Sequence, residues 1–170
     1  MGCVIQVIGK KDSGKTLTIE KVVKRLKSEG YKVAVIKHSH HEIDLQGKDT
    51  YRFWSAGSDY VAFLNGKGVI MGKFDVKSLL KLLPVDVVLI EGFKNLELGK
   101  VFEILRPEDS DQLSEEIVGY VHGECKKVEV KLIGDGKVLD NNEYVIMLYN
   151  LMEMLNLSEV VRGARSYRDK

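Results

Sequence analysis

Residues 9–16 read GKKDSGKT, a complete GxxxxGK[ST] phosphate-binding loop. The loop follows the apolar run CVIQVI at Cys3–Ile8, which has the composition of a buried strand. After the loop, apolar residues recur with approximately helical spacing at Leu17, Ile19, Val22, Val23 and Leu26. A strand, a glycine-containing turn and a helix in this order indicate a phosphate bound at the start of the helix.

Each specified position of the GxxxxGK[ST] pattern has a physical role. Gly9 and Gly14 let the backbone turn tightly and bring its N–H groups close to phosphate oxygens. Lys15 supplies a mobile positive charge for the β- and γ-phosphates, and we assign it a catalytic role, while the Thr16 hydroxyl can ligate Mg²⁺. The predicted nucleotide contacts from this region are Gly9, Lys11, Asp12, Ser13, Gly14, Lys15, Thr16 and Leu17. The alternative is a glycine-rich turn with an exposed lysine.

A second acidic group is needed to complete a magnesium shell, and Glu91 fits this requirement. It ends the mostly apolar run VDVVLI at Val85–Ile90, so we predict a catalytic and metal-binding role for it. Gly92 follows and is expected to present its N–H near a γ-phosphate. Asp86 lies at the far end of the same run and ranks below Glu91. The alternative for Glu91 is a helix cap or an ion-pair partner.

The segment KHSHHEID at Lys37–Asp44 holds three of the four histidines beside two acids. A transition-metal site is one interpretation, but the compressed spacing without a nearby cysteine disfavours it. Binding of phosphate, Mg²⁺ or an anionic substrate is the preferred one, with His38 as a nucleotide contact and Asp44 as a metal ligand. The third interpretation is that these titratable side chains are exposed to solvent and bind no ligand. Lys48 and Arg52 follow as cations that either bind an anion or form surface ion pairs.

The remaining pattern predicts an α/β fold with a mostly parallel sheet flanked by helices. KVAVIK at Lys32–Lys37 reads as a second strand that completes a βαβ unit. Additional β-hairpins are expected at Asn65–Gly68 and at Asp135–Gly136. Glu116–Val121 reads as a possible strand, and Asn142 as the cap of a helix that runs to about Leu155.

The 170 residues predict a single nucleotide-binding domain over 1–157 and a basic tail over 158–170. A net charge of +1 gives no global excess that would favour nucleic acid or a membrane surface as partner. No apolar run approaches the roughly 20 residues of a membrane span, so a cytoplasmic location is expected. Cys3 and Cys125 belong to no CxxC pair, which favours two thiols in a reducing compartment over a disulfide or a zinc site.

Three motifs in order carry a family resemblance: the phosphate-binding loop, the block KHSHHEIDLQGKDTYRFWSAGSD at Lys37–Asp59, and DVVLIEGFK at Asp86–Lys94. Together they resemble the MobB family, the molybdopterin-guanine dinucleotide biosynthesis adapter proteins, over roughly residues 3 to 106. The middle block is the most distinctive of the three. One departure is the loop interior Lys10–Ser13, which is more charged than the Gly/Ser-rich interiors of the family.

The resemblance implies a P-loop NTPase fold, binding of GTP with Mg²⁺, weak GTP hydrolysis and a homodimer. It also implies a supporting role to the guanylyltransferase that joins GMP to molybdopterin, with molybdopterin itself as a further candidate partner. The family's nucleotide-binding residues match Gly14, Lys15 and Thr16, and its acidic strand end matches Glu91. No NKxD sequence is present, so GTP rather than ATP rests on the resemblance alone.

The main alternative is a P-loop small-molecule kinase that uses ATP or GTP. In that case the His38–Asp44 segment, Lys48 and Arg52 would hold the acceptor. The same fold serves both functions, so fold cannot separate them. A non-catalytic metal carrier that uses the three clustered histidines is a third possibility.

Overall fold

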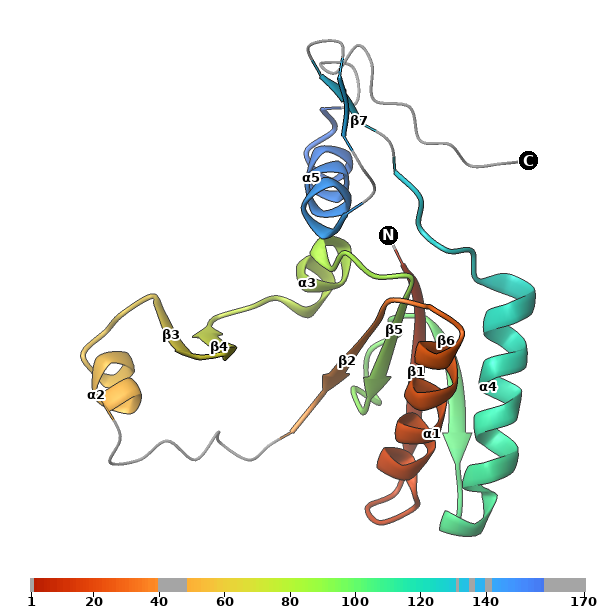
Figure 1. Cartoon of the computed structure of the whole chain (residues 1–170). Helices are drawn as coiled ribbons and strands as arrows, with labels where there is room; N and C mark the ends of the chain where they lie inside the picture. Colours follow the sequence, from red (N-terminus) through yellow and green to blue (C-terminus); the bar gives the residue numbers. More distant parts are fainter. Residues whose placement is uncertain (1, 40–48, 131, 135–136, 140–141, 158–170) are drawn as a thin grey trace.

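A parallel β-sheet forms the centre of the computed structural model, which describes residues 2–39, 49–130, 132–134, 137–139 and 142–157 (Figure 1). The strand order is β2-β5-β1-β6, and every neighbouring pair is parallel. The strands are β1 (Cys3–Gly9), β2 (Val33–Lys37), β5 (Val87–Glu91) and β6 (Lys100–Ile104). The predicted α/β sheet is confirmed. The fully apolar stretch of β5 explains why this strand lies between β1 and β2, where both of its faces are buried.

Each face of the sheet packs against different helices. Ile5 and Val7 of β1 face a core shared with α1 (Lys15–Ser28) and α4 (Ser110–Glu124), which lie side by side (Figure 1). Val4 and the alternate residues of β5 face α3 (Val76–Leu82) on the other side. This division follows from the two-residue period of strand side chains.

The expected strand at Glu116–Val121 is wrong, because these residues belong to α4. The helix is preceded by a 3-10 turn at Pro107–Asp109. Its buried apolar residues are Leu113, Ile117, Val118 and Val121, whose spacing is helical. The six-residue window 116–121 contains three β-branched residues and is too short to show this period.

One hairpin and one helix form an arm that extends away from the sheet (Figure 1). The arm comprises α2 (Asp49–Ser55), β3 (Tyr60–Asn65) and β4 (Lys67–Gly72), and its hairpin confirms the turn predicted at Asn65–Gly68. Seven large apolar side chains on or beside the arm are more than half exposed: Phe53, Tyr60, Phe63, Leu64, Val69, Ile70 and Phe74. The arm therefore exposes a large apolar surface to solvent.

The C-terminal part of the described chain has a small core of its own. It contains the hairpin β7 (Leu132–Gly134) and β8 (Lys137–Leu139), followed by α5 (Glu143–Met154). Val130, Val145 and Ile146 are its buried residues. The predicted cap is confirmed, since Asn142 Oδ1 accepts hydrogen bonds from the N–H groups of Tyr144 (3.0 Å) and Val145 (3.1 Å). The predicted basic tail lies outside the described residues.

Cys3 and Cys125 form a disulfide, with Cα atoms 5.5 Å apart, so the expectation of two free thiols is wrong. Cys3 opens β1, and Cys125 follows α4, which runs antiparallel to β1 along the sheet (Figure 1). The start of the strand and the end of the helix therefore meet at one edge of the core. A sequence separation of 122 residues hides this proximity from sequence analysis.

Candidate functional site

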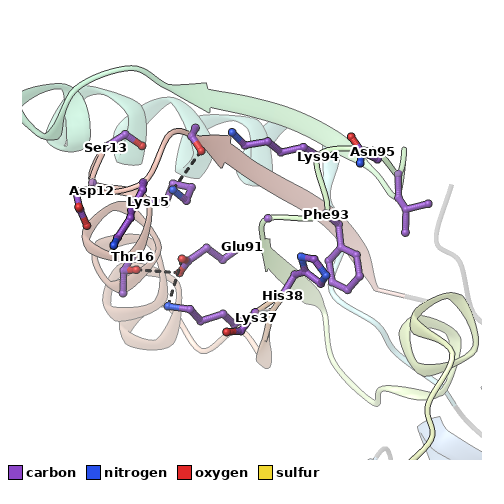
Figure 2. A pocket seen from close by; sticks show the side chains of 16 residues that line it. Asp12, Ser13, Lys15, Thr16, Lys37, His38, Glu91, Phe93, Lys94 and Asn95 are labelled. Carbon is purple, nitrogen blue, oxygen red and sulfur yellow. Dashed lines mark hydrogen bonds and ion pairs between the residues drawn. The ribbon is translucent and has the colours of Figure 1, made fainter. Parts of the chain in front are cut away.

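The predicted phosphate loop and Glu91 meet at the carboxyl end of the sheet. In the strand register, Val7 of β1 and Lys37 of β2 both pair with Glu91 of β5. A cavity of about 820 Å³ opens there, lined by the phosphate loop, by residues 37–39 after β2 and by residues 91–96 after β5 (Figure 2). Ligands of parallel α/β sheets bind in this position.

The backbone of the loop suits an anion. Gly14 is the N-cap residue of α1 with φ +93°, and a Cβ on it would lie 2.9 Å from the Cα of Pro107, so glycine is required there. In the part of the chain that the structure describes, the N–H groups of Gly14, Lys15 and Thr16 donate to no acceptor. Unpaired N–H groups at the positive end of a helix favour a bound phosphate.

The Lys15 ammonium group is bonded to the loop itself. Its Nζ donates to the carbonyl oxygen of Gly9 at 3.2 Å and to that of Lys10. The Ser13 hydroxyl is buried and has no hydrogen-bond partner among the described residues. In Figure 2 the Ser13 side chain points away from Glu91.

Thr16 and Glu91 provide two oxygen atoms suited to Mg²⁺. Thr16 Oγ1 donates to Glu91 Oε2 at 2.9 Å, and Lys37 Nζ forms an ion pair with Glu91 Oε1 at 3.3 Å (Figure 2). The Glu91 side chain is 12% exposed, so its carboxylate is largely withdrawn from water. A hydroxyl and a carboxylate beside a phosphate-binding loop are hard oxygen ligands of the kind that Mg²⁺ prefers. The residues present therefore fit a magnesium ion.

The other predicted contacts are placed less directly. Gly92 has φ +99°, and its N–H donates to the carbonyl oxygen of Val7 at 3.1 Å, so this N–H is occupied in the structure. His38 lines the cavity, with its ring centroid 4.4 Å from that of Phe93. Lys11 and Asp12 line the cavity, whereas the exposed Leu17 does not.

Several predicted groups lie elsewhere. Asp44, His40, His41 and Lys48 fall outside the described residues. Arg52 lies on the arm, where it forms an exposed ion pair with Asp49 at 3.5 Å, as the alternative interpretation held. Among the residues that the structure describes, no group of three His, Cys, Asp or Glu side chains could hold a metal ion.

Sequence reasoning missed the second wall of the cavity. Lys37 contacts Glu91, and residues 93–96 line the side opposite the phosphate loop. The sequence contained one signal, because the segment GFKN directly follows the acidic end of a buried strand. Parallel strands bring such segments to the ligand edge of the sheet.

A comparison with protein-family models matches residues 4–131 to the family described as molybdopterin guanine dinucleotide synthesis protein B, MobB. The chain belongs to the MobB family. It is similar to the probable molybdopterin-guanine dinucleotide biosynthesis adapter protein of Bacillus subtilis, at 35% identity over 121 residues, 65% of this chain and 69% of that protein. The adapter protein of Haemophilus influenzae is 34% identical over 128 residues, 69% of this chain and 71% of that protein.

A solved structure supports the fold of this MobB family member. The crystal structure of a molybdopterin-guanine biosynthesis protein B superimposes with a TM-score of 0.50 at 18% identity, covering 70% of this chain and 99% of that one. The family model ends at residue 131, so β7, β8 and α5 lie beyond the matched region. None of the helices in the described residues is long and apolar enough to cross a membrane.

Proposed function

We propose that this MobB family member is a GTP-binding adapter with weak GTPase activity in the biosynthesis of molybdopterin-guanine dinucleotide. The adapter role rests on the family and on relatives that carry this name. The observation that carries nucleotide binding is the convergence of Lys15, Thr16 and Glu91 around unpaired N–H groups. The chain would support the guanylyltransferase that joins GMP to molybdopterin.

In this proposal the triphosphate of GTP lies on the phosphate loop. The N–H groups of Gly14, Lys15 and Thr16 hold phosphate oxygens, and Lys15 exchanges its two carbonyl acceptors for the β- and γ-phosphates. Thr16 Oγ1 and the Glu91 carboxylate would hold Mg²⁺, which neutralises charge on the β- and γ-phosphate oxygens. Lys37 Nζ pairs with Glu91 Oε1 and so orients the carboxylate.

Slow hydrolysis follows from what lines the cavity. Fast phosphoryl transfer to water needs a residue that orients the water and a cation that stabilises the transition state, often glutamine and arginine. Neither residue type lines the cavity in the described part of the chain. We therefore expect the chain to bind GTP and to hydrolyse it slowly.

We also propose a homodimer. The arm supports the homodimer, because its exposed apolar side chains are costly in a monomer, and so are the outer edges of β3 and β4, which pair with no other strand in the described residues. A second copy of the arm would cover both at once, as two-fold symmetric interfaces do. Light scattering of the parent and of Leu64→Asp tests this, and a monomeric parent would contradict it.

The central test is a calorimetric titration of the full chain with GTP and with ATP, with and without Mg²⁺. We expect tight binding of GTP that weakens by about tenfold or more in Lys15→Ala, because charge-assisted contacts to phosphate are lost. Lys81→Met, an exposed lysine on α3, is the matched control. Unchanged GTP affinity in Lys15→Ala would refute the proposal.

Turnover separates the adapter from the kinase. An adapter hydrolyses GTP slowly whether or not small acceptors are present, and its effect is measured as faster guanylyl transfer when the partner enzyme is added. A kinase consumes nucleotide rapidly only with its acceptor. Rapid, acceptor-dependent consumption of ATP would overturn the adapter proposal.

A further inference from the structure

The cavity extends beyond the phosphate loop. With phosphates near Lys15 and a metal ion at Thr16 and Glu91, the far end of the cavity remains, bounded by His38, Phe93, Lys94 and Asn95. We call these four residues the distal subsite. In Figure 2 they lie across Glu91 from the loop, and the Lys94 side chain extends back toward the loop.

The backbone of the distal subsite is held by Gln6, a polar side chain in the middle of β1 that is only 1% exposed. Gln6 Nε2 donates to the carbonyl oxygens of Gly92 and Phe93, both at 2.8 Å, and Gln6 Oε1 accepts from the N–H of Leu98 at 3.4 Å. An amide buried in an apolar sheet is costly unless its hydrogen bonds are made. Gln6 therefore fixes the course of residues 92–98.

Phe93 is held in an unusual conformation by this arrangement. Its φ is +53°, in the left-handed region that aromatic residues rarely adopt. The ring packs partly on the core and presents the rest beside His38, with an angle of 37° between the two ring planes. Such backbone geometry persists only where surrounding contacts impose it, and it is concentrated at binding sites.

The chemistry of the distal subsite combines aromatic surface with positive charge. His38 and Phe93 form a ring pair, and the Asn95 side chain adds amide donors and an acceptor. Lys94 is exposed and has no ion-pair partner within the described residues. Across the whole cavity four lysines, Lys11, Lys15, Lys37 and Lys94, face two carboxylates, Asp12 and Glu91. The excess of cations favours an anion.

We propose that the distal subsite binds a second ligand, a planar heterocycle that carries a phosphate or carboxylate group, next to the terminal phosphate of the nucleotide. The ring packs on Phe93 and His38, and its anionic group pairs with Lys94. Gln6 is a positioning residue that acts through the backbone of residues 92–98. This inference rests on the proposed function, which places a nucleotide on the phosphate loop and suggests a pterin as the probe.

The test uses pterin-6-carboxylate as a fluorescent probe, titrated against the full chain saturated with GTPγS and Mg²⁺. We expect saturable binding of one probe per chain. Lys94→Met should weaken it by about tenfold, through loss of a charge-assisted contact, and Phe93→Leu by about threefold to tenfold. Lys81→Met is again the control and should leave probe affinity unchanged. Unsubstituted pterin and inorganic phosphate, each with half of the ligand's chemistry, should bind more weakly than the probe.

The outcomes separate the two proposals. Absence of GTPγS binding refutes the proposed function, whereas GTPγS binding without saturable probe binding overturns the distal subsite alone. Equal probe affinity in the parent and in Lys94→Met also overturns it. So does binding of inorganic phosphate as tight as binding of the probe. Gln6→Leu should lower probe affinity by a larger factor than GTPγS affinity, and a reduction of both by one factor would reassign Gln6 to a purely structural role. Because Lys94 and Asn95 are exposed, Lys94→Met keeps the test decisive if Gln6→Leu fails to fold.

Discussion

Replacement of Asp86 by alanine should destabilise the protein by about 3–5 kcal/mol. Asp86 precedes β5 and is 4% exposed. Its Oδ2 accepts from the N–H of Lys32 at 2.7 Å, and its Oδ1 accepts from the N–H of Val128 at 2.6 Å. Each hydrogen bond to a charged group contributes about 1.5–3 kcal/mol, and alanine leaves both N–H groups without this acceptor. The alanine variant no longer buries a carboxylate, so the total cost is smaller than the sum of the two hydrogen bonds.

Asparagine at this position separates the two contacts. It keeps one acceptor oxygen but places an NH₂ group against the second N–H, so Asp86→Asn should cost about 1.5–3 kcal/mol. Urea unfolding followed by circular dichroism measures both free energies, with Asp111→Ala as the control. Among the described residues, the Asp111 side chain forms a surface ion pair with Lys21, so its loss should cost less than about 1 kcal/mol. A cost below about 1 kcal/mol for Asp86→Ala would refute the reasoning.

Three further predictions concern the site and the packing of α1 and α4. Glu91→Gln should weaken the Mg²⁺ dependence of GTP binding more than binding without metal, and equal Mg²⁺ dependence in variant and parent would make Glu91 structural. His122 Nε2, 2.6 Å from Glu29 Oε2, holds the pKa of the Glu29 carboxyl below its usual 4.5, so this stabilisation is present above that pH and is lost as pH falls through the lowered pKa. The melting temperature of the parent should therefore fall more steeply below pH 4.5 than that of Glu29→Gln, and parallel curves would contradict this. Reduction of the Cys3–Cys125 bond, verified by thiol titration, should cost about 2–4 kcal/mol, and an unchanged urea midpoint would be the contrary result.

Much of the fold was predictable because its signals are local. The apolar runs at β1 and β5, the loop between Gly9 and Thr16 and the turn at Gly66 each show their structure within a few residues. Glu91 could be placed beside the loop because parallel strands end at one edge of the sheet. The strand order could not be predicted, in particular the position of β5 between β1 and β2.

The rest depended on contacts between distant residues. Gln6 reads as one polar residue in an apolar strand, and only the fold shows that its partners are Gly92, Phe93 and Leu98. Asp86 was ranked below Glu91 for metal binding, and the structure gives it a separate role at the opposite end of β5. The disulfide was missed for the same reason as these contacts.

In the proposed function, the bonds from Lys15 to its own loop would affect how a nucleotide enters. Because the carbonyl oxygens of Gly9 and Lys10 already hold the ammonium group, the loop keeps its curvature before any phosphate arrives. A triphosphate bound as proposed would exchange one set of acceptors for another and would not have to order a collapsed chain segment. A preorganised receptor of this kind loses little conformational entropy on binding. The charged loop interior Lys10–Ser13 is therefore compatible with the cradle, since main-chain oxygens hold the lysine in place.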